Sequence, residues 1–561
     1  MKRIIFSIIG AALIAVPAWS QTNAKRASLD DSGRLTLEDV TIEIPASARD
    51  ADHLEGFPFG RPANPSFKNT RGVTLVDIDN DGLDEILFGA DQTFYALNSD
   101  GTVLWEKAMD GINILPPTVD DMDGDGEWDI AVNNAGVSIY SGRTYLLNAD
   151  GTDKPGWPVN FDDHWMINAP VMADVNGDGV MEIIAGERIS GSAGLLHVLD
   201  ITGEELEGWP IETTATVAFT PSVGDINNDG VTDVISGLST DGSLYAFDAS
   251  GNILEGFPQV PADASLSYQS PLLLDLNGDE NLEIIGSRHG ENAEYYAVDF
   301  EGNYVEGWPV ASPGWTYAPP SAADTDADGS FEIFMGNPNT DGSEVPMPMD
   351  VIYGFGSDGS DLPNFPIAKV GGNEGVITVA DIDDNGVVDL VFTSNLFTSE
   401  DGQGFVHAYA MDGSGELDGF PLRTPAMTFL NSALLGDIDG DGVLDLTTLS
   451  ASTNFGASID SVFVSAFNLE LPYIPENIYF NAYKGSNGRT GLIESSVVST
   501  ENRRVEKLSV YPNPTSGNFF IELPENSTNA VMSICDIRGR QVMQENINAS
   551  GNSAYPVNTS K

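Results

Sequence analysis

Hydrophobic and polar residues alternate in short runs through the middle of the chain, and the order of these runs repeats. A short apolar stretch such as 169–173 precedes an acidic loop, and a second apolar run such as 182–186 follows it. After a variable loop comes a run with period-two alternation, as in 244–248, then a glycine-containing turn and a Gly-aromatic-Pro ending, as in 156–158. Period-two runs bounded by turn residues are typical of β-strands, and no long helical pattern occurs. Each repeat therefore predicts a unit of four strands.

An acidic loop identifies each repeat. Its pattern is D-x-[DN]-x-[DN]-G-x-x-[DE], and successive copies begin 44 to 57 residues apart. The eight copies begin at Asp77, Asp121, Asp174, Asp225, Asp275, Asp324, Asp381 and Asp437. Four-stranded units of this length are typical of propeller blades, because one such sheet covers both faces only by packing against its neighbours. We therefore expect an all-β protein with an eight-bladed β-propeller, or a seven-bladed one if a repeat is degenerate.

The N-terminus has the pattern of an export signal. Lys2 and Arg3 precede an apolar run over 4–16, and small residues lead to Ser20, so a signal peptide is predicted at 1–20. The apolar run is short for a membrane span and no other long one exists, so no transmembrane segment is expected after signal cleavage.

The remaining boundaries follow from changes in composition. Residues 21–51 are polar and acidic and predict a loose leader, and 52–491 contain the propeller. The segment 53–58 ends like a repeat but precedes the first loop, so we expect it to supply a closing strand to the last blade. Residues 492–506 are a polar linker.

The last part of the chain, 507–561, carries a separate signature. It consists of Tyr-Pro-Asn-Pro-Thr-Ser-Gly at 511–517 and Asp-x-x-Gly-Arg at 536–540. These motifs resemble the C-terminal sorting domain of the type IX secretion system of Bacteroidetes. The resemblance implies a small β-sandwich-like domain, the type IX secretion machinery as a partner, and a protein that is secreted or held on the outer-membrane surface of a Bacteroidetes-like bacterium. The chain stops before the family's Gly-x-Tyr strand and basic end, so we expect a truncated domain.

Composition excludes several partners. The 561 residues include 85 Asp and Glu against 24 Lys and Arg, which gives a formal charge of −61. Nucleic acid and anionic membranes are therefore poor partners, since binding phosphate groups requires Lys and Arg. Hydrophobic residues make up 41% of the chain, enough for a packed core. The one cysteine, Cys535, excludes an internal disulfide.

The acidic loops have the chemistry of calcium sites. Positions 1, 3, 5 and 9 of each loop are oxygen-bearing side chains, and the glycine at position 6 permits a sharp bend. Calcium takes six to eight oxygen ligands from flexible loops, whereas magnesium requires a stricter octahedron. The alternative is a set of acidic turns without an ion, because Asp, Asn and Gly are ordinary turn residues. We predict calcium, since converging carboxylates without a cation repel one another.

At this point the repeats resemble the FG-GAP (or VCBS) repeats of bacterial surface proteins and of the integrin α-chain propeller. In that family the calcium loop joins the first two strands of a blade. Carried over position by position, the ligands are Asp77, Asp79, Asp81 and Glu85; Asp121, Asp123, Asp125 and Asp129; Asp174, Asn176, Asp178 and Glu182; Asp225, Asn227, Asp229 and Asp233; Asp275, Asn277, Asp279 and Glu283; Asp324, Asp326, Asp328 and Glu332; Asp381, Asp383, Asn385 and Asp389; and Asp437, Asp439, Asp441 and Asp445. The fifth loop departs from the pattern, because Glu280 replaces glycine at position 6 and a positive φ is unfavourable there.

The other end of the propeller is the candidate binding face. Connections between blades and the variable loops meet there, and they carry aromatic residues that could stack on a sugar or a protein partner. The candidates are Trp165, Trp315, Tyr268 and Tyr317. Blade-to-blade packing is the alternative for such aromatics, and we favour it for the Gly-aromatic-Pro residues.

No catalytic residue is predicted. The chain contains none of the G-x-S-x-G, H-E-x-x-H or P-loop motifs, and His197 and His407 lie within strand patterns. The function that fits is a secreted or cell-surface calcium-binding propeller for adhesion or for binding glycans or proteins. The alternative is a carbohydrate-active enzyme of the polysaccharide-lyase kind. It is disfavoured because 155–421 contain only three Lys or Arg residues to hold an acidic sugar.

Overall fold

The computed structural model describes two N-terminal strands, the propeller and five C-terminal strands. The described residues are 19–29, 35–45, 53–494 with gaps at 65–68, 137–140, 163, 167, 188–193, 218, 239–241, 262–263, 267–269, 313–315, 338–348, 398–401, 429 and 453–459, and then 510–511, 519–522, 530–535, 541–547 and 554–557. The chain divides into two units, Met1–Ser496 and Val497–Lys561. Residues 1–18 of the predicted signal peptide lie outside the described part.

The first four blades match the first four acidic loops. Their strands, from the first to the last in each blade, are β4 (Thr74–Val76), β5 (Glu85–Ala90), β6 (Thr93–Leu97) and β7 (Val103–Ala108); β9 (Thr118–Asp120), β10 (Asp129–Gly136), β11 (Ser141–Asn148) and β12 (Val159–Asp162); β13 (Val171–Ala173), β14 (Glu182–Gly186), β15 (Leu195–Leu199) and β16 (Ile211–Glu212); and β17 (Ser222–Gly224), β18 (Asp233–Gly237) and β19 (Leu244–Phe247). In blade 4 a bridge between Leu244 and Gln259 stands in the place of the fourth strand. The short β8 (Gly111–Ile112) pairs with the far end of β10.

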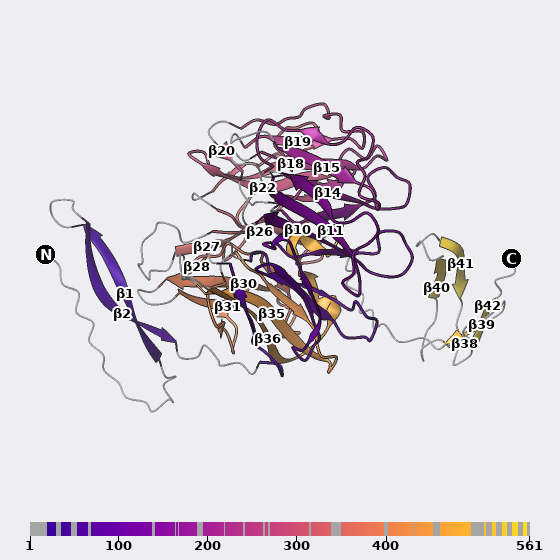
Figure 1. Cartoon of the computed structure of the whole chain (residues 1–561). Helices are drawn as coiled ribbons and strands as arrows, with labels where there is room; N and C mark the ends of the chain where they lie inside the picture. The colour runs from indigo at the N-terminus through magenta and orange to yellow at the C-terminus, as the bar shows by residue number, and fades with distance from the viewer. Residues whose placement is uncertain are drawn as a thin grey trace. The chain divides into compact units, whose positions relative to one another are not determined.

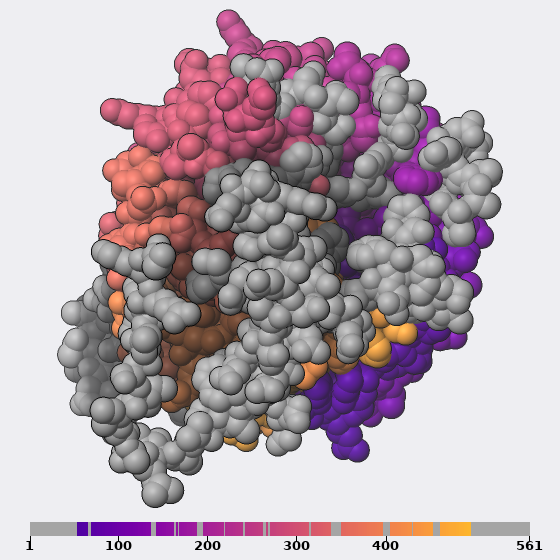
Figure 2. Space-filling model, turned by 90° about the vertical axis from the view of Figure 1, so that its left-hand side faces the viewer, coloured from indigo at the N-terminus to yellow at the C-terminus, as the bar shows by residue number. Residues whose placement is uncertain are grey.

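The last four blades complete the ring. Their strands are β21 (Leu272–Leu274), β22 (Glu283–Gly290), β23 (Glu294–Val298) and β24 (Val310–Ala311), with β20 (Ala264–Ser265) beside β22; β25 (Ser321–Ala323), β26 (Glu332–Gly336), β27 (Met349–Phe355) and β28 (Ile367–Lys369); β29 (Thr378–Ala380), β30 (Asp389–Phe397) and β31 (Gly402–Ala410) with β32 (Gly415–Glu416) and β33 (Leu422–Arg423); and β34 (Ala433–Gly436), β35 (Val443–Ala451) and β36 (Asp460–Pro472). On the face drawn in Figure 2, the colours of the chain run round the perimeter from indigo through magenta to orange. The prediction of eight blades is confirmed, and the seven-bladed alternative is wrong.

The ring closes where the sequence predicts. The N-terminal strand β3 (Phe59–Ala63) pairs antiparallel with β36 and becomes the fourth strand of blade 8 (Figure 1). The preceding segment adds a hydrogen bond from the Leu54 N–H to the Ala466 carbonyl, at 3.0 Å. Blade 8 thus contains strands from both ends of the propeller sequence, so the ring cannot open without breaking the sheet of that blade.

Neighbouring blades are joined by the Gly-aromatic-Pro segments. The tryptophans of three such segments, and Trp105 of β7, donate their indole N–H groups to carbonyl groups in the glycine turn of the next blade, at 2.8 to 3.0 Å. The pairs are Trp105 with Ala149, Trp157 with Ile201, Trp209 with Ala249, and Trp308 with Ser357. The glycine before the aromatic residue is required by this contact, because a Cβ on Gly156 would lie 2.2 Å from the Thr202 carbonyl oxygen. The interpretation of these aromatics as packing residues is confirmed.

A segment that follows the last blade fills the axis of the ring; we call residues 473–494 the axial segment. It contains the 3₁₀ turns η1 (Pro475–Asn477) and η2 (Tyr483–Gly485) and the strand β37 (Ile478–Phe480), which pairs with β29 of blade 7. The Asn481 side chain bonds to Leu435 of blade 8. Carbonyl groups farther along accept N–H groups from blades 2 to 5 in turn, at 2.7 to 3.1 Å. Those pairs are Asn487 with Val119, Gly488 with Met172, Thr490 with Val223, and Gly491 with Leu273.

The axial segment solves a problem that the inner edges of the blades create. The first strands of neighbouring blades lie next to each other around the axis, and each has an edge of unpaired N–H and carbonyl groups. Buried backbone groups of this kind need partners. A chain segment that visits one inner strand after another supplies them, so the axis is occupied by this protein's own backbone.

Buried cations anchor this segment. Arg489, which is 0% exposed, donates to the carbonyls of Tyr483, Ser486 and Pro117 and to the Thr74 hydroxyl. Lys484 donates to the carbonyls of Thr220 and Pro221 and to the Ser222 hydroxyl. From the opposite side, Arg71 of blade 1 reaches the Tyr317 and Glu374 carbonyls at 2.6 Å each. The guanidinium groups of Arg71 and Arg489 each lie 5.9 Å from the Tyr483 ring.

Outside the propeller the strands are few. The strands β1 (Trp19–Leu29) and β2 (Leu35–Pro45) form an antiparallel hairpin, although we expect a loose leader over 21–51. Alternating apolar residues at Val40, Ile42 and Ile44 are typical of the second strand. In the C-terminal unit, β38 (Val510–Tyr511), β39 (Phe519–Glu522) and β42 (Ala554–Val557) form one sheet, and β40 (Ala530–Cys535) pairs with β41 (Gln541–Ile547).

Replacing Arg489 tests the axial segment. The Arg489→Met variant keeps the length of the side chain but removes the buried guanidinium bonds to three carbonyls and to the Thr74 hydroxyl, so the free energy of unfolding should fall by about 3 kcal/mol. Arg423, which is exposed on β33, provides the control: Arg423→Met should change stability by less than about 0.5 kcal/mol. Chemical denaturation of both variants measures the difference, and equal stabilities would contradict the role given to Arg489.

Candidate metal centres in the blade loops

All eight acidic loops share one backbone arrangement. Each joins the first strand of a blade to the second, as the sequence predicts. The N–H of the residue at position 6 donates to the carboxylate at position 1, at 2.8 to 3.0 Å in every loop. The N–H of the residue at position 2 donates to the carboxylate at position 9, at 2.8 to 3.2 Å. The loops are therefore wound so that the first and ninth side chains face the same interior.

Glu280 follows this arrangement in the fifth loop. Its φ is 74°, whereas the glycines at position 6 of the other loops have φ between 80° and 91°. Its N–H still reaches Asp275, at 3.0 Å. The surrounding bonds thus hold a residue with a side chain in the left-handed region, so the substitution strains the fifth loop without unwinding it.

The carboxylate at position 9 is the most buried carboxylate of each loop. Its exposure is between 0% and 8% in all eight blades. Burial raises the pKa to about 7 in six of these residues, against the lowering effect of the backbone hydrogen bond. These six are Glu85, Glu182, Asp233, Glu283, Asp389 and Asp445. A carboxylate in this position favours a nearby cation, because burial without one disfavours its charged form.

In five loops, three carboxylates converge closely enough to hold a metal ion. Their oxygen atoms lie within 4.8 Å of one another. The groups are Asp77, Asp79 and Glu85; Asp121, Asp123 and Asp125; Asp324, Asp326 and Glu332; Asp381, Asp383 and Asp389; and Asp437, Asp439 and Asp445. Four of the five include the buried residue at position 9, and the group in blade 2 does not.

Two of these loops contain buried oxygen atoms without a protein donor. The second oxygen atoms of Asp389 and Asp445 are buried and accept no hydrogen bond, although both side chains are 0% exposed. A buried carboxylate oxygen without a donor is unfavourable unless a cation lies beside it. The residues present therefore fit a hard divalent cation that prefers oxygen ligands.

Loops 3, 4 and 5 differ because asparagine occupies position 3. The Asn176 and Asn277 amide groups donate to Glu182 and Glu283, at 2.8 and 2.9 Å. In loop 4 the amide of Asn227 donates to Asp229 instead, at 3.0 Å. These loops thus carry one charge fewer than loops 1, 6 and 8, and an amide donor partly satisfies the buried carboxylates of loops 3 and 5.

Two of the four candidate ligand-face residues lie in the described part of the chain. Trp165 is half-buried in the connection between blades 2 and 3, and Tyr317 is half-buried between blades 5 and 6. The Tyr317 ring lies 6.2 Å from the ring of His289. Trp315 and Tyr268 lie outside the described residues.

The two strand histidines occupy equivalent positions of blades 3 and 7, where five other blades have tyrosine. His197 contacts Glu187 and Glu205, and these carboxylates outweigh its burial and raise its pKa. His407 lies between Glu416 and the Ser394 hydroxyl, which is 2.7 Å from Nε2. This order of groups resembles a nucleophile with its base, but Ser394 is 2% and His407 6% exposed. Both histidines therefore act in packing, as their strand positions predict.

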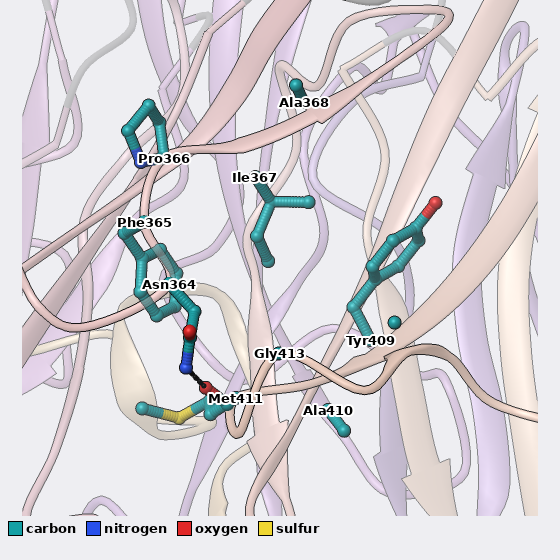
Figure 3. A pocket seen from close by; sticks show the side chains of 10 residues that line it. Asn364, Phe365, Pro366, Ile367, Ala368, Tyr409, Ala410, Met411 and Gly413 are labelled. Atoms are coloured by element: carbon teal, nitrogen blue, oxygen red, sulfur yellow. Dashed lines mark hydrogen bonds between the residues drawn. The ribbon is translucent and has the colours of Figure 1, made fainter.

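A cavity of about 190 Å³ lies between blades 6 and 7 (Figure 3). Phe365, Ile367, Tyr409 and Met411 line it, so its walls are largely apolar. Here the Asn364 amide donates to the Met411 carbonyl, at 3.1 Å, where four other interfaces have an indole N–H. At this interface Phe365 stands where those interfaces have tryptophan, and its smaller side chain leaves the cavity.

Sequence comparison identifies two parts of the chain. A profile of the FG-GAP-like repeat matches residues 121–185 and 225–286, and a profile of the secretion system C-terminal sorting domain matches residues 509–561. The chain thus contains FG-GAP-like repeats and a type IX secretion sorting domain, and both resemblances are confirmed. The sorting domain implies handling by the type IX machinery and a secreted or cell-surface protein. No curated protein matches the chain.

Solved structures with a similar fold have low sequence identity. The biofilm matrix protein Bap1 of V. cholerae is 12% identical with a TM-score of 0.34, over 77% of this chain and 90% of that one. The C-terminal domain of Pseudomonas aeruginosa PilY1 is 12% identical with a TM-score of 0.36, over 68% and 92%. The Dos1 propeller is 11% identical with a TM-score of 0.39, over 75% and 96%. In the part of the chain that the structure describes, no helix has the length and apolarity that a membrane crossing requires.

Glu280 provides a test of the loop geometry. The Glu280→Gly variant should raise the free energy of unfolding by about 1 kcal/mol, because glycine adopts a positive φ without steric conflict. The Glu280→Ala variant removes the charge but keeps the Cβ, so it should bring no such gain. Equal stability of the two variants in thermal or chemical denaturation would show that the fifth loop is not strained.

Proposed function

We propose that the protein is a secreted or cell-surface propeller whose loops bind calcium and whose opposite end binds a glycan or a protein in adhesion. The observation that carries the calcium proposal is the convergence of the buried carboxylate at position 9 with the carboxylates at positions 1 and 3 in loops 1, 6, 7 and 8. When bound, calcium would supply positive charge to these side chains and fasten the first two strands of a blade. The predicted positions 1, 3, 5 and 9 are the side chains that would hold it.

Calcium suits these loops better than magnesium or a transition metal. The side chains offer carboxylate and amide oxygens, and the loops contain no cysteine or histidine. Oxygen ligands on a flexible loop favour calcium, while magnesium keeps its water and requires a strict octahedron. The FG-GAP-like match over loops 2 to 5 supports the same assignment by analogy.

The positions where the chain enters and leaves the propeller support binding at the end that carries the variable loops. β3 runs antiparallel to β36, which ends beside the acidic loop of blade 8, where Tyr473 bonds to Gly442. The axial segment runs parallel to β21 at Leu492 and so heads toward the acidic loop of blade 5. Both connections thus lie at the acidic-loop end. The end with the variable loops and Trp165 is then left to a partner, as expected of a binding module on a rigid scaffold.

Removing calcium tests the first half of the proposal. Each occupied site adds roughly 1.4 to 2.7 kcal/mol when free calcium is ten- to a hundredfold above Kd. A chelator should therefore lower the melting temperature by about 10 °C, and calcium rather than magnesium should restore it. As a control, Asp100→Asn changes an aspartate of a glycine turn and should leave the calcium-dependent shift intact. A melt that does not respond to chelator or calcium would contradict the assignment.

A binding assay tests the second half. The purified full chain, with calcium present, is incubated with a panel of polysaccharides and with cell-surface protein extracts, and retention is measured. Retention without product is expected, and Trp165→Ala should weaken it at least severalfold while Trp105→Ala, at a blade interface, should change stability instead. Unsaturated or reducing-end products would overturn the binding proposal in favour of an enzyme.

A further inference from the structure

Blade 2 differs from the other blades at one residue of its outer segment. In seven blades, the residue three positions before the aromatic-Pro pair bonds through its N–H to the third strand, and its carbonyl accepts the N–H of the aromatic residue. This residue is Leu54, Leu206, Leu254, Val305, Leu362 or Leu417 in six of the blades. In blade 2 it is Lys154, with the same two backbone bonds at 2.9 and 3.1 Å.

The apolar residues at this position pack into the blade interfaces. Leu54 is 8% exposed and belongs to the core between blades 8 and 1, and the other five also contact core clusters. Lysine at such a position loses the contacts of a branched apolar side chain. Its ammonium group must also find oxygen partners, because the side chain is only 12% exposed.

Those partners are the carboxylates of the second acidic loop. The Lys154 ammonium forms an ion pair with Asp129 Oδ1, and it lies 3.7 Å from Asp123 Oδ2. Asp129 is the 0% exposed residue at position 9, and Asp123 is position 3. The other oxygen of Asp129 accepts the Met122 N–H, at 3.2 Å. One oxygen of the buried carboxylate therefore accepts a backbone hydrogen bond, and the other has no hydrogen-bond donor but forms the ion pair with the Lys154 ammonium.

The ammonium group thus occupies the place where the other loops gather their ligands. In loops 1, 6, 7 and 8 the residue at position 9 converges with positions 1 and 3, whereas in loop 2 only Asp121, Asp123 and Asp125 converge. A lysine ammonium is a compact point charge with three donors, and it satisfies a carboxylate without a metal. A divalent cation between the same oxygens would lie against this positive charge.

We propose that Lys154 is the built-in cation of the second loop, and that blade 2 keeps its loop folded without calcium while the loops of blades 1, 6, 7 and 8 depend on the metal. Lys154 is thereby a specificity-determining residue that subtracts one site from the calcium content of the ring. This inference rests on the proposed calcium function for its metal-binding consequence, but its structural part stands on the Lys154–Asp129 contact alone. The acidic loop of blade 2 would therefore stay folded when little calcium is present.

Calcium stoichiometry of the full chain tests the proposal directly. Stripped protein is titrated with calcium by equilibrium dialysis, and the number of ions bound per chain is compared between variants. Lys154→Leu, which installs the residue of the other blades, should bind one ion more than the original chain. Leu362→Lys, which installs the lysine in blade 6, should bind one ion fewer. Lys107→Leu removes a similar cation, paired with Asp153 outside the loops, and should leave the number unchanged.

Melting in chelator separates this proposal from the proposed calcium function. Without metal, Lys154→Leu should melt several degrees below the original chain because Asp129 loses its cation, and Lys107→Leu should melt close to it. If no variant binds calcium, the proposed calcium function fails. The melting temperatures in chelator then test by themselves whether Lys154 stabilises the second loop. The proposal is overturned if Lys154→Leu melts like the original chain in chelator, or if both chains bind the same non-zero number of ions.

Discussion

A buried carboxylate at the start of the second strand is the constraint on which the blades depend. In every blade it fixes the acidic loop through a backbone N–H, and it is at most 8% exposed. A carboxylate in that position keeps its charge only beside a cation or strong donors. In loops 1, 6, 7 and 8 two further carboxylates lie beside the buried one and could hold a metal ion. In loops 3 and 5 an asparagine amide donates to the buried carboxylate, and in loop 2 the Lys154 ammonium pairs with it. Seven of the eight blades thus balance the same charge in one of three ways, while in loop 4 the Asn227 amide donates to Asp229 and not to the buried Asp233.

The ring imposes a second constraint at its axis, where the inner strands leave unpaired edges. The axial segment meets it with backbone bonds to blades 2 to 5, a strand beside blade 7, and the buried cations Arg489 and Lys484. Because the axis is filled by the chain itself, ligands are left to the two ends of the propeller. The acidic loops occupy one end together with both chain connections, and the other end carries the variable loops.

The sequence predicted what depends on local pattern. The period-two runs, the turn at each glycine and the spacing of the loops give eight blades, and the ending at 53–58 gives the closing strand. The axial segment was missed, because Asn487, Gly488 and Gly491 bond to strands hundreds of residues away and show no periodicity of their own. The sequence contains Lys154 at a position where the other repeats have leucine or valine, but only the contact with Asp129 shows that its ammonium group pairs with the acidic loop. The contact of Lys154 with the second acidic loop depends on tertiary structure, and the spacing of residues in the sequence does not predict it.

These constraints give a consistent picture of a rigid, strongly acidic module, exported by its sorting domain and built around charge that must be neutralised. Calcium in the loops remains the central proposal, with Lys154 as its internal counterpart. Anomalous diffraction from crystals of the full chain grown in calcium tests both at once. The account predicts anomalous peaks in loops 1, 6, 7 and 8, and none in loop 2, where the Lys154 ammonium should lie on Asp129. The absence of peaks in those four loops, or a peak in loop 2 with Lys154 displaced, would contradict it.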